Sequence, residues 1–274
     1  MANLKEFVET NLPGLQWFPT SSSTLALFIA HLSDNNLSPA TISSTISPVS
    51  FFHKLYGYED PAMHFIIRRI IAGAHKLRPS QDTRQPIDLE LLHKLARSTP
   101  YVTQSVYLAA MLHSMYLLMF HAFLRIGEVT NSPNTLLLHN IDISSSKLHV
   151  KFTSFKHHSG PPHTITINQS NSPFCPVSSL LNFLKLRSNV PGPLFSLPSN
   201  QPLTRSQFSS FFQFSLQWAG LPNPQIKPHS FRIGAATHAA SLGCTEQQIQ
   251  KMGRWKSNAF KKYIRCPSFT SPFQ

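Results

Sequence analysis

The sequence is poor in acidic residues. Only 11 of its 274 residues are Asp or Glu, whereas 24 are Lys or Arg, so the formal net charge is +13. Most basic side chains therefore lack a carboxylate partner within the chain, and an uncompensated positive field attracts polyanions through counterion release. Nucleic acid is the leading expected partner. An anionic membrane surface, or no special partner at all, are the alternatives.

Cysteine is also scarce. The chain has three cysteines, Cys175, Cys244 and Cys266, and no two of them form a CxxC pair. An odd number without pairs argues against a disulfide framework and against a cysteine-rich zinc site. The N-terminal residues lack the basic-then-apolar pattern of a secretory signal, so a reducing compartment is expected.

Long hydrophobic runs are limited to one stretch, residues 106–124. Its length of about 19 residues is near the lower limit for crossing a membrane. The stretch contains His113 and His121 and continues directly into Arg125 and Glu128. A buried core helix explains these polar residues better than a membrane span, and no membrane partner is expected.

The first part of the chain is predicted to be helical. Apolar residues recur at helical spacing over 24–32, and residues 64–77 show a similar pattern. Between them, Ser38 followed by Pro39 is typical of a helix start, and we expect Pro48 to bend or divide that helix. These residues predict a small all-helical unit.

Segment 78–86 is polar, contains two prolines and shows no apolar periodicity. Such composition is typical of a linker. We therefore expect two units, one over 1–84 and the other over 85–274.

The second unit is predicted to be mainly α-helical with a small antiparallel β-sheet. A helix is expected over 88–97, and the long apolar helix should end near Arg125. Residues 147–153 and 163–167 alternate between apolar and polar side chains, which predicts a β-hairpin with Lys156 near its tip. Helices follow from residue 176 onward.

Three later helix starts are visible in the sequence. Thr204 with Gln207 and Thr245 with Gln248 each have the spacing of a capping box. Ser257 is expected to begin the last helix.

Arg125 follows the apolar run directly, with Glu128 three residues later. A guanidinium at the end of a core helix is costly unless it meets an anion. Glu128 is either a purely structural ion-pair partner or the group that orients Arg125 toward a phosphate, whose oxygens match the forked guanidinium.

The C-terminal region combines several groups that suit phosphate chemistry. His229 lies three residues before Arg232 at the start of a predicted helix, although this spacing alone is expected by chance. Tyr263 is the only tyrosine after Arg232 and is flanked by Lys261, Lys262 and Arg265. Taken alone, Tyr263 would be read as an anchor for an amphipathic helix.

Taken in order, these motifs resemble the tyrosine recombinase (phage integrase) family. The order is R-x-x-E at 125–128, a hairpin lysine, H-x-x-R at 229–232, G-R-W at 253–255 and a tyrosine on the last helix. The resemblance covers most of the chain. It implies a helical, SAM-like core-binding domain over 1–84 and an α+β catalytic domain over 85–274.

The resemblance also implies roles for individual residues. The clamp arginines would be Arg125 and Arg232, the hairpin lysine Lys156, the activating histidine His229, the nucleophile Tyr263 and the supporting acid Glu128. No cofactor and no metal ion are implied.

One position departs from the family pattern. The family usually has His or Trp nine residues before the tyrosine, but here Arg254 occupies that position and Trp255 follows it. Three explanations are open: Trp255 acts from a loop one residue shorter, Arg254 replaces the usual residue, or the step is impaired. Only 11 residues follow Tyr263, so docking of the tail on a neighbouring subunit is in doubt.

The implied function is cleavage and rejoining of double-stranded DNA through a 3′-phosphotyrosyl intermediate, by a homo-oligomer on DNA. The run from Gly253 to Arg265 looks most like recombinases of eukaryotic mobile elements. That origin would place the protein in the nucleus, and otherwise it would be cytoplasmic with the chromosome. The alternatives are a domesticated, inactive DNA-binding protein, for which residues 236–255 form a candidate helix-turn-helix, and a type IB topoisomerase-like enzyme.

Overall fold

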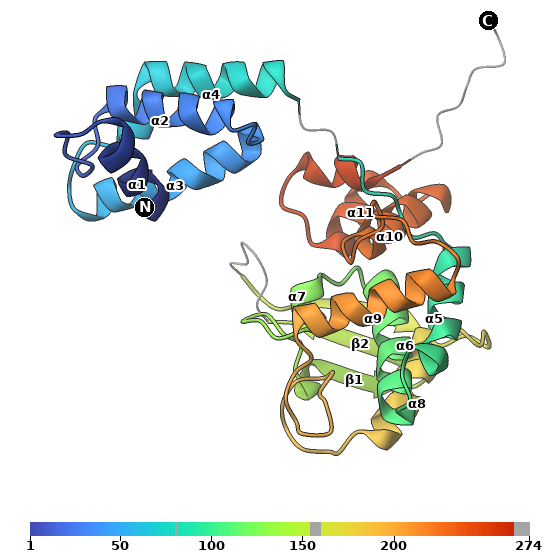
Figure 1. Ribbon diagram of the computed structural model, residues 1–274. Helices are drawn as coiled ribbons and strands as arrows, with labels where there is room; N and C mark the ends of the chain where they lie inside the picture. Colours follow the sequence, from blue (N-terminus) through green and yellow to red (C-terminus); the bar gives the residue numbers. More distant parts are fainter. Residues whose placement is uncertain (80–81, 154–159, 266–274) are drawn as a thin grey trace, which may run out of the picture. The chain divides into compact units, whose positions relative to one another are not determined.

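The computed structural model describes residues 1–79, 82–153 and 160–265 (Figure 1). The chain divides into two compact units, Met1–Asp82 and Thr83–Gln274. This division falls within the segment 78–86 that the sequence predicts to be a linker. Each unit has its own hydrophobic core.

The first unit is entirely helical in its described residues. Ser21 caps α2 by accepting a hydrogen bond from the Thr24 amide at 3.0 Å, and Ser38 caps α3 in the same way. Pro48 does not divide α3, which continues through it. The elements of this unit are α1 (Ala2–Asn11), α2 (Ser22–Asp34), α3 (Pro39–Leu55), the 3₁₀ turn η1 (Pro61–Met63) and α4 (Phe65–Leu77).

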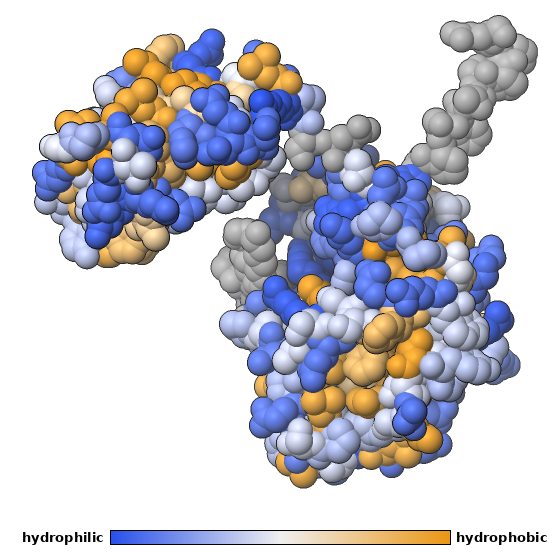
Figure 2. All heavy atoms as spheres, viewed as in Figure 1, coloured by the Kyte–Doolittle hydropathy of each residue, from blue (hydrophilic) through white to orange (hydrophobic). Residues whose placement is uncertain are grey.

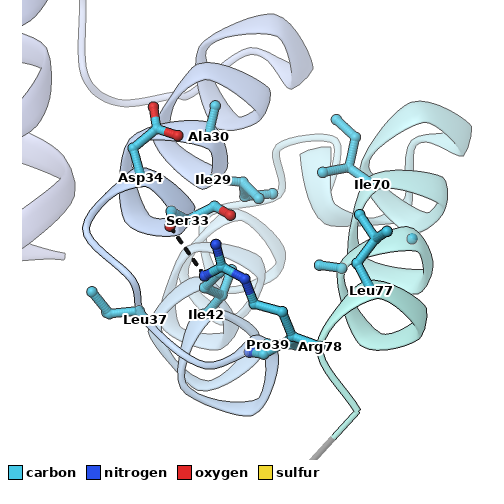
Figure 3. A pocket seen from close by; sticks show the side chains of 12 residues that line it. Ile29, Ala30, Ser33, Asp34, Leu37, Pro39, Ile42, Ile70, Leu77 and Arg78 are labelled. Carbon is cyan, nitrogen blue, oxygen red and sulfur yellow. Dashed lines mark hydrogen bonds between the residues drawn. The ribbon is translucent and has the colours of Figure 1, made fainter.

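The surface of the first unit is partly apolar. Figure 2 shows several hydrophobic patches on it, and its exposed large side chains include Phe51, Leu55 and Phe65. A pocket of about 340 Å³ lies between α2, α3 and α4 (Figure 3). At this pocket the Arg78 guanidinium donates a hydrogen bond to the Ser33 carbonyl at 3.4 Å.

The second unit packs its helices with a three-stranded sheet whose strands alternate between more buried and more exposed residues. Its first helices are α5 (Leu89–Val102), α6 (Val106–His121) and α7 (Ile126–Val129), followed by the 3₁₀ turn η2 (Leu138–Asn140) and the strands β1 (Ile141–Ser144), β2 (Lys147–Phe152) and β3 (His163–Asn168). The remaining elements are α8 (Pro176–Leu186), α9 (Arg205–Trp218), α10 (Ser230–Ser241), α11 (Glu246–Gly253) and the 3₁₀ helix η3 (Asn258–Tyr263).

The predicted fold class, mainly α-helical with a small antiparallel sheet, is confirmed. β2 pairs with β3, so that Leu148 is opposite Ile167 and Val150 is opposite Ile165. The strand β1, which the sequence analysis did not predict, pairs with the other edge of β2. It was missed because it has only four residues and is joined to β2 by two serines, Ser145 and Ser146, rather than by glycine or proline.

The apolar helix α6 is buried at the centre of the second unit and packs against α5, α8 and α10. It ends at His121, earlier than predicted, because Phe123 takes a left-handed conformation with φ 52° and redirects the chain. Arg125 then begins the separate helix α7. Among the described residues, no helix has the length and apolar character that crossing a membrane requires.

Candidate active site

Arg125 is fixed by the short helix that follows it. Its main-chain amide donates to Glu128 Oε2 at 2.8 Å, and its Nη1 donates to Glu128 Oε1 at 3.2 Å. The Glu128 side chain is 2% exposed, whereas that of Arg125 is 27% exposed. A buried carboxylate thus orients a partly exposed guanidinium.

Arg232 is almost completely buried in α10. Its Nη1 donates to the Phe123 carbonyl, and its Nη2 donates to the Gly253 carbonyl at 2.7 Å. Burial lowers the pKa of the Arg232 guanidinium, and the neighbouring cations Arg125 and Arg254 lower it further. Within the described residues its Nε has no hydrogen-bond partner. The site therefore holds more positive charge than it neutralises, and an anion bound there would stabilise it.

Arg254 lies buried in the core of the unit, paired with Glu128. It ends α11 in the left-handed conformation, with φ 55°, and its Nη2 lies 2.7 Å from Glu128 Oε2. Its guanidinium also donates to the carbonyls of Ala122 and Phe123 and lies 3.7 Å above the Phe152 ring. Burial lowers the pKa of Arg254 to about 10, although Glu128 opposes the shift.

Trp255, rather than Arg254, lies beside the tyrosine. The rings of Trp255 and Tyr263 have centroids 5.0 Å apart, and the Arg232 guanidinium lies 4.4 Å from the Trp255 ring. His229, the residue before α10, places its ring 5.0 Å from that of Tyr263. Of the three explanations for the departure at this position, the geometry favours contact through Trp255.

The segment that carries Tyr263 is tied down by its own unit. Phe260 of η3 is 1% exposed, and Ser257 caps η3 through the Ala259 amide. The Thr237 hydroxyl of α10 donates a hydrogen bond to the Tyr263 carbonyl at 3.2 Å. The Thr237 hydroxyl oxygen also accepts a hydrogen bond from the Arg265 amide at 3.0 Å. No sequence pattern marks Thr237, because a threonine inside a helix carries no distinguishing signal.

A pocket of about 310 Å³ opens next to Arg125 and His229. Among the described residues, Glu128 is its one acidic lining residue, and Arg205, at the start of α9, is a further basic one. Arg205 was also missed by the sequence analysis, because it lies about eighty residues from Arg125 and belongs to none of the motifs.

The structure brings most of the predicted site residues together. Arg125, Glu128, Arg232 and Arg254 form one cluster through Glu128 and mutual charge interactions, and His229, Trp255 and Tyr263 adjoin it. Lys156 lies outside the described residues, so its predicted place at the hairpin tip stays a prediction.

Comparison with known families decides the classification. Residues 88–265 match the phage integrase family. This chain belongs to the phage integrase family. A search of curated proteins found no match.

Several solved structures share the fold at low sequence identity. The XerH site-specific recombinase in its post-cleavage complex with palindromic difH substrate has a TM-score of 0.71 and 14% identity, over 95% of this chain and 72% of that one. The Tn1549 transposon integrase in complex with circular intermediate DNA has a TM-score of 0.63 and 12% identity, over 98% of this chain and 89% of that one. A lambda integrase dimer bound to a COC′ core site has a TM-score of 0.60 and 15% identity, over 97% of this chain and 86% of that one.

Proposed function

We propose that this chain cleaves and rejoins DNA strands through a covalent 3′-phosphotyrosyl intermediate, in site-specific recombination or DNA integration. The observation that carries the proposal is the meeting of Arg232, Trp255 and Tyr263: the guanidinium lies 4.4 Å from the indole and 6.0 Å from the phenol ring. These side chains come from two ends of a 32-residue segment and meet only in the folded unit.

The positive site suits the charge change of the reaction. A DNA phosphodiester carries one negative charge, and its pentacoordinate transition state carries about two. Arg125 and Arg232 are already held in place, by Glu128 and by main-chain carbonyls respectively. Fixed cations of this kind stabilise developing charge without rearranging during the reaction.

The proposed step balances as a transesterification. The Tyr263 hydroxyl oxygen attacks the phosphorus, and the bond from phosphorus to the 5′ oxygen breaks. The phenol proton passes to His229, whose ring is 5.0 Å from the tyrosine ring, and the departing 5′ oxygen takes a proton from Lys156. A 5′ hydroxyl from another strand reverses the reaction, so strand exchange needs no ATP and no cofactor.

The partner and location follow from the same proposal. The solved relatives named above are bound to DNA, and one is a dimer, which supports double-stranded DNA as substrate and a homo-oligomer as the acting form. Residues 1–84 would serve as the core-binding domain and residues 85–274 as the catalytic domain. An origin in a eukaryotic mobile element would place the protein in the nucleus.

The test is a search for the covalent adduct. The chain is incubated with a random-sequence duplex library that carries ³²P at the 5′ ends, because the 5′ fragment is the one that stays joined to tyrosine. The duplexes also carry nicks at scanned positions. A nick lets the short 5′-hydroxyl product dissociate, so the covalent adduct accumulates. Denaturing electrophoresis should show a labelled protein band that Tyr263→Phe abolishes. An adduct that persists in Tyr263→Phe would remove this residue from the role.

Two other outcomes select the alternatives. Salt-dependent DNA binding without any adduct would indicate an inactive DNA-binding member of the family, with α10 and α11 as its helix pair. Relaxation of supercoiled plasmid by a monomer would indicate topoisomerase-like activity.

A further inference from the structure

Arg205 occupies an unusual place for a cation. It is the first residue of α9, whose N-cap is Thr204. The N-terminus of a helix already carries partial positive charge, so a basic side chain there is unfavourable unless an anion is nearby. Arg205 also lines the pocket that contains Arg125 and His229.

Within the described part of the chain, Arg205 makes no hydrogen bond or ion pair. Glu128, the only acidic residue that lines this pocket in the described part of the chain, is already engaged by other donors. Glu128 Oε1 accepts from Arg125 Nη1, and Oε2 accepts from the Arg125 amide and from Arg254 Nη2 at 2.7 Å. The exposed guanidinium of Arg205 is therefore left available to an incoming ligand.

The turn beside Arg205 leaves room for its guanidinium. Gly127 lies in α7, between Arg125 and Glu128, and a Cβ at this position would be 3.0 Å from Arg205 Nη2 and 3.2 Å from Ser132 Oγ. Any larger residue would press on the guanidinium. Figure 1 shows the first turn of α9 next to α7, in agreement with this contact.

We propose that Arg205 binds a second phosphate of the DNA strand, adjacent to the phosphate that Arg125 and Arg232 hold. A guanidinium offers paired N–H donors that match two phosphate oxygens, and the helix N-terminus adds partial positive charge on the same side. This inference rests on the proposed function and assigns a subsite beside the reacting phosphate.

The chemistry predicts what kind of contact this is. The second phosphate gains no charge in the transition state, so Arg205 stabilises bound DNA and the transition state equally. Loss of Arg205 should weaken binding while leaving the cleavage rate of bound DNA nearly unchanged. Loss of Arg125, which faces the reacting phosphate, should lower that rate.

Binding is measured on the full chain carrying Tyr263→Phe, which cannot form an adduct, with a mixed-sequence 40-base-pair duplex as the probe. Arg205→Gln should weaken binding about three- to tenfold near 100 mM salt and reduce the slope of log K against log[salt] by about one. Arg205→Lys should keep the slope, because it keeps the charge. Lys185→Gln is the matched control: it also removes one exposed charge of this unit, but from α8, which Figure 1 shows far from α10 and α11.

A second measurement locates the phosphate. On duplexes whose cleavage point has been mapped through the adduct, a neutral methylphosphonate replaces each flanking phosphate in turn. One adjacent replacement should weaken binding of the chain with Arg205 but cause no further loss with Arg205→Gln. Adduct formation at saturating Arg205→Gln should stay within about threefold of the unmodified rate.

An unchanged salt slope in Arg205→Gln would overturn the proposal, and so would equal losses for every methylphosphonate with both proteins. The binding test does not depend on the nucleophile. Failure to form an adduct would therefore count against the proposed function, whereas failure of the slope to change would count against the Arg205 subsite.

Discussion

The Thr237 hydroxyl donates a hydrogen bond to the main-chain carbonyl of Tyr263 at 3.2 Å, and so links α10 to the segment that carries the proposed nucleophile. Thr237→Val keeps the shape of the side chain but removes this bond and the one from the Arg265 amide. We expect adduct formation to slow about tenfold, because small displacements of a reacting group are costly.

The conservative variant separates positioning from folding. Thr237→Ser keeps the hydroxyl and should restore the rate of adduct formation. The free energy of unfolding should fall by no more than about 2 kcal/mol in Thr237→Val, since each of the two lost hydrogen bonds contributes only about 1 kcal/mol net, and it should stay near normal in Thr237→Ser. Equal rates for Thr237→Val and the unmodified chain would show that this contact does not position Tyr263.

Arg254→Met tests whether Arg254 is structural. The substitution removes one partner of a buried ion pair and leaves Glu128 with Arg125 alone. We expect the free energy of unfolding to fall by about 3–5 kcal/mol, measured by urea titration of the chain. An unchanged midpoint together with loss of adduct formation would instead assign Arg254 a direct role at the phosphate.

Trp255→Phe should affect chemistry more than stability. The smaller ring loses part of the contact with Arg232 and Tyr263 but stays apolar. Adduct formation at saturating DNA should slow by about tenfold or more, and hydrogen exchange in the unit should stay close to normal. Trp218→Phe on α9, a tryptophan that is 45% exposed, is the matched control and should cleave normally.

Gly234→Ala should disrupt the second unit. A Cβ at this position in α10 would lie 1.8 Å from the main-chain carbonyl oxygen of Ile87. Ile87 cannot easily move away, because its amide donates a hydrogen bond to the Ser230 carbonyl of the same helix. Overpacking of this kind typically costs 1–3 kcal/mol or more, and faster hydrogen exchange in α10 should reveal it. Gly73→Ala in α4, where nothing lies within 4 Å of the new Cβ, should instead slow exchange slightly.

Acid should weaken the second unit through His121. Burial, aided by nearby His238 and His93, lowers the pKa of His121 from 6.5 to about 4. Between these values the unfolded chain binds a proton that the folded chain excludes, so stability falls as the pH drops from 7 toward 4. His121 alone should contribute about 1 kcal/mol of loss between pH 7 and 5.5. Urea titration of His121→Gln should show a smaller loss over the same range.

Local signals in the sequence predicted much of the second unit. The capping boxes at Thr204 and Thr245 are both present, and the β2–β3 pairing follows the predicted alternation. The proximity of Arg125 to Arg232 was expected only through family resemblance, because over a hundred residues separate them.

What the sequence could not supply is the direction in which side chains point. Arg254 and Trp255 are neighbours, yet one faces Glu128 and the other faces Tyr263. This divergence depends on the left-handed backbone conformation of Arg254. An arginine at that position does not predict such a conformation, which glycine or asparagine would have suggested. The roles of Arg205 and Thr237 likewise depend on segments that are distant in the sequence and that folding brings near them.

The hydrogen bonds that hold Arg232 depend on correct folding. Its guanidinium donates hydrogen bonds to the carbonyls of Phe123 and Gly253, which are 130 residues apart, so both bonds exist only after these distant segments have folded against α10. Under the proposed function, a nascent or partly unfolded copy would not yet hold Arg232 in position to bind the reacting phosphate. Under the same proposal, incompletely folded copies would not cleave DNA, and no separate inhibitor would be needed to restrain them.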